Sequence, residues 1–183
     1  MEIVHDRERL VVALRERGVD YLMSDEGQAA PLSDEALIAS LAAHEDARLR
    51  SALTALFILR PELAERVPAL VRQLAPAAQD ELQIRYMAAV YLQRFWRTRL
   101  EIHHLERPDL PDLFSAELGL PAPEDMYGKP GLQALAEWHQ RQHPVTYNRR
   151  VEYELVIEHL IASLKMQAQK REPTQKHEHA PIG

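Results

Sequence analysis

The feature that most constrains the fold is a recurrence of apolar residues at helical spacing, with a period in the mid-thirties. Each unit has an apolar first helix, followed by an apolar-Arg pair that opens a second helix. The matched positions are Leu37, Ile38 and Leu41 with Leu70, Val71 and Leu74, 33 residues later, and Leu49-Arg50 with Ile84-Arg85, 35 residues later. Such a period, with two helices per unit, is typical of stacked helical hairpins.

The two units read LIASLAAHEDARLRSALTAL and ALVRQLAPAAQDELQIRYMAAVYL. Both place a short polar turn, containing Asp46 or Asp80, before an Ala-rich second helix. Over residues 34–95 the chain therefore resembles HEAT repeats. The resemblance implies a short array of helical hairpins, and an irregular helical bundle is the alternative arrangement. Because an array of about three repeats is the usual minimum, the flanking helices are expected to cap these two units.

Composition supports an all-α fold. The 183 residues include only 6 Gly, 3 Phe and 2 Trp, while Ala and Leu dominate, and this mix favours helix over sheet. We predict about six to eight helices in a single domain over residues 1–170. It comprises a HEAT-like core (34–107), a Pro-rich connector (108–130) and C-terminal helices (131–170). Residues 171–183 are predicted to form a disordered tail.

Capping residues and apolar stripes indicate where the helices lie. Ser33 is a good N-cap for a helix through residue 43, and a second helix is expected to start at Asp46. The apolar stripe that runs from Ile84 through Phe95 and Ile102 predicts one long helix over 80–107. Shorter helices are expected over 111–118 and 132–143.

The last predicted helix, over 147–170, is apolar on two sides. Its main stripe contains Tyr153, Ile157, Leu160 and Leu164. The opposite side carries Val151, Leu155 and Ala162. A helix of this kind is either central to the fold or also covers a partner chain. Homodimerisation through this helix is one expectation.

Charge and composition exclude several functional classes. The net charge is −6, which argues against a general nucleic-acid or membrane-surface binder. The absence of cysteine excludes disulfides, thiolate catalysis and cysteine-based zinc sites. The N-terminus lacks the pattern of a signal peptide, and no apolar run approaches the roughly 20 residues of a membrane span. A cytoplasmic protein is the expectation.

No catalytic motif is present. The chain has no Gly-x-Ser-x-Gly elbow and no Gly-rich phosphate loop. We therefore expect a non-catalytic protein without a cofactor. The predicted function is a protein-interaction, scaffold or accessory module, because stacked helical hairpins leave a groove to which partners bind.

Tryptophan, tyrosine and arginine are the residue types most common at interaction hot spots. The candidate interaction residues are Arg94, Trp96, Arg97, Tyr127, Trp138, Arg149 and Arg150. Because guanidinium groups contact phosphates and aromatic rings stack on bases, an Arg/aromatic patch of this kind gives the alternative hypothesis of a nucleic-acid-associated regulatory protein.

A His/Glu metal site is the second alternative. His139 and His143 are spaced i, i+4, so both imidazoles could face one metal ion from a single helix. Glu101 and His104 have the Glu-x-x-His spacing of carboxylate-bridged metal bundles. Neither pair completes a site alone. A solvated ion-pair face is the better explanation of the second pair, and packing with compensation of the helix dipole explains the first.

Overall fold

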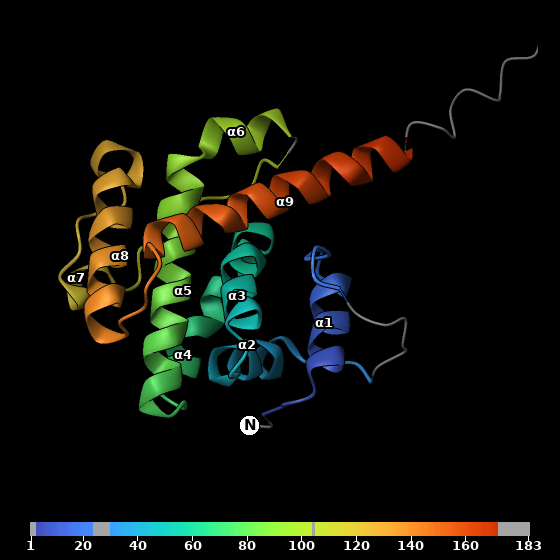
Figure 1. The fold of residues 1–183 in the computed structure, drawn as a ribbon, viewed down its shortest axis with the longest axis horizontal. Helices are drawn as coiled ribbons and strands as arrows, with labels where there is room; N and C mark the ends of the chain where they lie inside the picture. The colour runs from blue at the N-terminus through green and yellow to red at the C-terminus, as the bar shows by residue number, and fades with distance from the viewer. Residues whose placement is uncertain (1–2, 24–29, 104, 172–183) are drawn as a thin grey trace, which may run out of the picture.

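The computed structural model describes residues 3–23, 30–103 and 105–171. The α-helices are α1 (Arg7–Glu16), α2 (Asp34–Ala43), α3 (Ala47–Leu59), α4 (Val67–Val71), α5 (Pro76–Phe95), α6 (Arg97–Ile102), α7 (Ser115–Leu118), α8 (Lys129–Gln142) and α9 (Arg149–Arg171) (Figure 1). Two 3-10 helices, η1 (Pro61–Arg66) and η2 (Asp125–Gly128), accompany them. The described residues contain no strand, which confirms the all-α prediction. Apart from Arg171, the predicted tail lies outside these residues.

Side-chain caps fix where the early helices begin. The Ser33 hydroxyl accepts a hydrogen bond from the backbone N–H of Ala36 at the start of α2. The Asp46 carboxylate accepts one from the N–H of Arg48 at the start of α3. Each cap satisfies an N–H that the helix itself cannot pair. Both predicted helix starts are confirmed.

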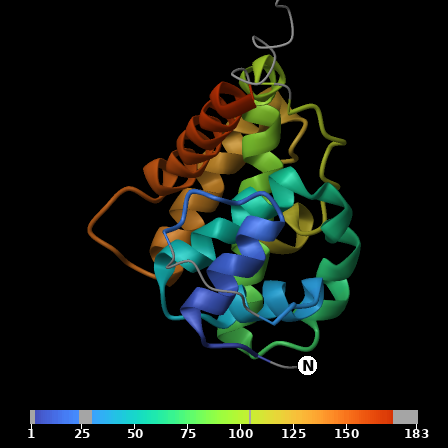
Figure 2. The same ribbon diagram turned by 90° about the vertical axis from the view of Figure 1, so that its right-hand side faces the viewer.

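Helix α5 forms the centre of the molecule. It packs against α2, α3, α4, α8 and α9, so it has neighbours on nearly every side (Figures 1 and 2). Its residues from Leu82 to Leu92 are buried without interruption, including Arg85. A helix buried all round needs apolar or small residues on every face, and the Ala-rich sequence of α5 supplies them.

The first predicted unit is a regular hairpin of α2 and α3, whereas the second is irregular. Its first helix is divided into η1 and the five-residue α4. The prolines Pro61 and Pro68 explain this division, because each removes a backbone donor and fits only the first turn of a helix. Leu49 and Ile84, the equivalent residues of the two units, are both fully buried in the common core.

The prediction of one long helix over 80–107 is wrong at Trp96. There α5 ends, and the non-helical backbone of Trp96 (φ −105°, ψ 16°) turns the chain into the short helix α6. After this turn Leu100 is buried, whereas Ile102, which the stripe placed in the core, is 67% exposed. The helical spacing of apolar residues continues past Phe95 in the sequence, but α6 does not continue the axis of α5.

The connector from Pro108 onward returns along α5 and contributes to the core. Leu110 and Phe114 are buried there. Buried groups of α5 hold this segment: the Tyr86 and Tyr91 hydroxyls donate to the carbonyls of Pro111 and Pro121, both at 2.7 Å. The helix predicted over 111–118 is confined to α7, which ends at Leu118 and is capped by Gly119 in the left-handed conformation (φ 65°).

Candidate functional site

A pocket of about 460 Å³ lies between the segment after α1, the start of α3 and the first half of α9. Apolar side chains form much of its wall. The residues that line it are Arg7, Tyr21, Leu22, Met23, Ala47, Arg48, Ser51, Tyr147, Glu152, Leu155, Val156 and His159. Pockets of this size, with apolar walls and few polar groups, are typical of binding sites.

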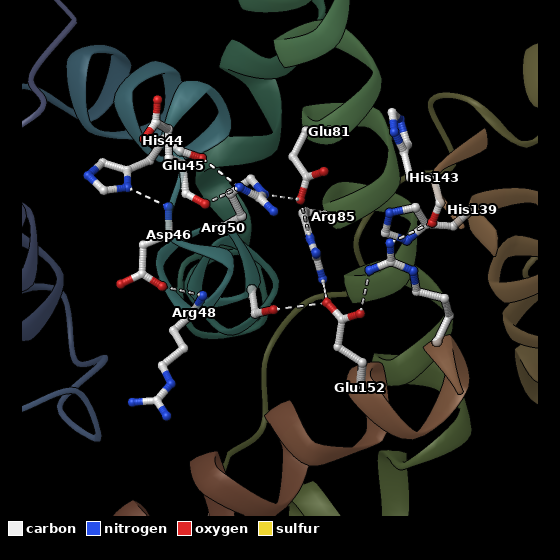
Figure 3. A network of polar contacts seen from close by, with 12 residues as sticks. His44, Glu45, Asp46, Arg48, Arg50, Glu81, Arg85, His139, His143 and Glu152 are labelled. Carbon is white, nitrogen blue, oxygen red and sulfur yellow. Dashed lines mark hydrogen bonds and ion pairs between the residues drawn. The ribbon is translucent and has the colours of Figure 1, made fainter. Parts of the chain in front are cut away.

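Glu152, which lines this pocket, also belongs to a cluster of charged side chains (Figure 3). One carboxylate oxygen lies 2.7 Å from Nη1 of Arg85 and accepts a hydrogen bond from the Ser51 hydroxyl at 3.2 Å. The other oxygen accepts a hydrogen bond from Nη1 of Arg149 at 2.8 Å. Burial opposes ionisation of Glu152, but the two guanidinium groups outweigh it and lower its pKa to about 2.

Arg85 is the centre of the cluster, and its side chain is only 1% exposed. Its Nε donates to Glu81 at 2.7 Å, and Arg50 reaches the same Glu81 oxygen at 3.2 Å. The cluster therefore joins α3, α5 and α9 through three arginines (Arg50, Arg85, Arg149) and two glutamates. A buried charge is tolerated only when it is paired in this way.

His139 of α8 lies beside the cluster and is fixed in its neutral form. The ring is 2% exposed, and its Nδ1 shares a hydrogen bond of 2.6 Å with the Tyr153 hydroxyl. Burial, together with the nearby Arg149 and Arg85, lowers the pKa of His139 to about 3. The histidine thus packs α8 against α9 and commits one ring nitrogen to a tyrosine.

The predicted metal-site residues do not come together as a ligand set in the part of the chain that the structure describes. There, no group of three or more His, Asp or Glu side chains could hold a metal ion. The His143 ring lies edge-on to His139, with 5.8 Å between the ring centroids. Glu101 is exposed on α6, and His104 lies outside the described residues.

Two of the predicted interaction residues lie inside the protein. Arg149 is buried, and it donates to the carbonyl of His143 as well as to Glu152. Arg94 is 10% exposed, donates to the carbonyl of Leu110 and lies 3.5 Å from Glu124. Both guanidinium groups therefore hold neighbouring segments in place.

The remaining predicted interaction residues lie nearer the surface but do not form one patch. Nη2 of Arg97 donates to both carboxylate oxygens of Asp109, at 2.6 and 2.8 Å. Arg150 pairs with Glu154 at 3.0 Å. Trp96 and Trp138 are half-buried against the core, whereas Tyr127 is well exposed in η2. Each arginine of the predicted set has a carboxylate neighbour, which reduces the positive charge available to a phosphate.

Exposed apolar side chains gather instead on the outward side of α9, which runs along the outer edge of the molecule (Figure 2). Val151, Leu155 and Met166 are 51%, 48% and 54% exposed, and Ala162 between them is exposed. We call these four residues the outer face of α9. Tyr147 and Met23, also exposed, flank it at the pocket. The core side of α9 is buried, so the predicted two-sided pattern is confirmed.

Sequence reasoning missed Met23, Met166 and the pocket itself. Met166 follows Ala162 by four residues, so its helical spacing was a usable signal. The pocket had no local signal, because its walls come from three distant segments. No protein-family model, curated protein or solved structure matches the chain.

Proposed function

We propose that the protein is a non-catalytic, cytoplasmic protein-interaction module that binds its partner through the outer face of α9 and the pocket beside it. One observation supports this proposal most: four apolar residues in line on a single helix remain exposed, although the same helix buries its other side. A line of exposed apolar side chains next to a pocket is typical of interaction sites.

The surroundings of α9 support binding without large rearrangement. Glu152 ties α9 to α5 through Arg85, and to α3 through Ser51. Arg99 of α6 holds Glu158 farther along α9. A binding helix anchored at several points loses little conformational freedom when its partner arrives, which favours affinity.

A free cation at the pocket rim adds a polar element. Arg48 is exposed, and within the described ranges no ion pair or hydrogen bond to its guanidinium group occurs. Most other arginines of this acidic chain have a partner. Arg48 is therefore free to meet a carboxylate at the edge of an apolar contact, the position at which interfaces carry their polar groups.

The resemblance of residues 34–95 to HEAT repeats also favours a protein-interaction function. Stacked helical hairpins form extended concave surfaces that such proteins use for binding. In this proposal the α2–α3 hairpin and α5 form the scaffold on which α9 is displayed.

The test is an affinity capture from the organism that encodes the chain, with the wild type and Leu155→Glu compared. The wild type should recover a stoichiometric protein, either a further copy of the chain or a different one. Leu155→Glu should recover at least about tenfold less, because it puts a charge into the apolar contact. Arg72→Glu, at an exposed residue in the turn after α4, is the control that should behave as wild type. Equal recovery by Leu155→Glu would contradict the proposal.

A further inference from the structure

We infer that the partner at the outer face of α9 is a second copy of this chain, whose α9 packs antiparallel against the first. The two-fold axis passes between residues 158 and 159. This inference rests on the proposed function, and it specifies the occupant, the orientation and the register of that site.

The spacing of the outer face is symmetric about this point. Val151 and Met166 lie equally far from the midpoint between residues 158 and 159, and so do Leu155 and Ala162. With about 100° of rotation per residue, all four lie within an arc of about 60°. An antiparallel copy therefore places Val151 against Met166, and Leu155 against Ala162, twice over. A self-matching surface of this kind is what a two-fold dimer requires.

The same symmetry brings Met166 of the second copy to the pocket. On α9, Met166 lies on the same side of the stripe as Glu152 and His159, which line the pocket. When the two-fold axis is perpendicular to the plane of the two antiparallel helices, the pocket-facing side of one helix and that of the other lie on the same side of the pair. Met166 of the second copy then comes level with Val151, next to the pocket opening. Its flexible thioether side chain suits an irregular apolar pocket.

The charges beside the stripe fit this register. Lys165 is exposed and has no ion pair among the described residues. In the antiparallel pair it comes alongside Glu154 of the second copy, at the edge opposite the pocket. The two Glu158 carboxylates meet near the axis, and each is already paired with Arg99 in its own chain, with 2.9 Å between Arg99 Nη2 and Glu158 Oε2. The region around the two-fold axis therefore contains both the Glu158 carboxylates and the Arg99 guanidinium groups that compensate them.

A parallel arrangement fits less well. It would set Leu155 against Leu155 and Ala162 against Ala162, which gives one crowded level and one with a gap. It would also bring the two Lys165 side chains together without a carboxylate between them. Matching large residues with small ones, and unlike charges with each other, favours the antiparallel pair.

The first experiment measures the mass of the full chain in solution by sedimentation equilibrium. The wild type is expected to be a dimer and Ala162→Glu a monomer. Ala168→Glu is the matched control, because Ala168 is exposed on the same helix but lies about 120° from Ala162 around the axis; it should remain dimeric. A monomeric wild type, or a dimer that survives Ala162→Glu, overturns the inference.

The second experiment tests the register, and the absence of native cysteine makes it clean. Leu155→Cys and Ala162→Cys are prepared separately, mixed and oxidised. The antiparallel register predicts a disulfide between the two variants and little self-linking of either one. Self-linking of each variant alone, without the mixed product, indicates a parallel pair and overturns the inference.

The two proposals fail in different ways. If the chain is monomeric but Leu155→Glu abolishes capture of a different protein, the second copy is excluded while the interaction module stands. If neither a dimer nor a captured protein depends on the outer face, both proposals fall.

Discussion

Glu152 occupies two environments at once, since it lines the pocket and also pairs with two buried arginines. Its carboxylate is the point at which α3, α5 and α9 meet. Removing one member of a buried charge group costs more than removing an exposed pair, because the remaining charge is left without compensation. The interior of the protein and its candidate interaction site are therefore connected through one residue.

Glu152→Gln is expected to lower the free energy of unfolding by about 3 kcal/mol, since Arg85 and Arg149 lose a shared counter-ion. Glu154→Gln is the matched control. Glu154 pairs with Arg150 on the same helix, but both side chains are about a quarter exposed, so the loss should stay below about 1 kcal/mol. Urea unfolding of both variants gives the comparison. Equal losses would show that burial of the cluster contributes little.

His139 gives the protein a pH dependence in a window that the carboxylates do not share. Its pKa falls from the ordinary 6.5 to about 3 on folding. Below pH 6.5 the unfolded chain therefore binds a proton that the folded chain does not. As the pH falls below 6.5, the free energy of unfolding should therefore decrease, by up to about 1.4 kcal/mol per pH unit. The pKa of Glu152, about 2 in the folded state, adds its own loss only below about pH 5.

Urea unfolding between pH 7 and pH 5 should show this slope in the wild type and a shallower one in His139→Asn, whose amide can still bond Tyr153. His143→Asn, which changes an exposed ring, should keep the wild-type slope. A slope unchanged in His139→Asn would mean that folding leaves the pKa of His139 where it is in the unfolded chain, and would contradict this prediction.

At the scale of the helix, local sequence signals predicted the starts of α2 and α3 because a cap is a contact between close neighbours, as Ser33 and Asp46 show. The turn at Trp96 could not be predicted in this way. The apolar spacing continues through Ile102, and the contacts that follow the turn are made with distant residues: Arg97 bonds Asp109 and Arg99 bonds Glu158. Interactions across 12 and 59 residues leave no local pattern.

In the candidate site, too, some features have a local sequence signal and others depend on distant residues. The apolar outer side of α9 was visible in the sequence, because helical spacing alone places Val151 and Leu155 on one side. The charge cluster was not visible. Glu81 and Arg85 have the i, i+4 spacing of an ordinary surface ion pair, and only the arrival of Glu152 from α9 makes them part of the interior.

Helices α5 and α8 approach so closely at one point that only glycine fits. A Cβ atom on Gly131 would lie 2.0 Å from Cε1 of Tyr91, and the Tyr91 hydroxyl is held by the carbonyl of Pro121. Gly131→Ala should therefore cost about 1–3 kcal/mol by overpacking. In a Tyr91→Leu background the same substitution should cost less, because the ring edge is gone. Thermal unfolding of the four proteins gives this coupling, and purely additive losses would contradict the contact.

At the scale of the whole molecule, none of the described helices combines the length and apolar composition of a membrane span. Among the described helices, α9 carries the longest line of exposed apolar side chains, while Ile102 on α6 and Met126 and Tyr127 on η2 are exposed apart from it. Most arginines are already paired within the chain, so charge offers a partner less than this apolar surface does. An association driven by α9 should consequently depend weakly on salt and strongly on single apolar positions.

If two chains fold as one dimer, stability must depend on protein concentration, because unfolding releases two chains from one particle. The Tm of the wild type should rise by about 2 °C for each tenfold increase in concentration, given the unfolding entropy of two chains of 183 residues. Ala162→Glu should melt at one temperature throughout, and Ala168→Glu should follow the wild type. Calorimetry between about 1 and 100 µM covers the range. A wild-type Tm that does not move would show that each chain unfolds alone, so the outer face of α9 would contribute nothing to stability.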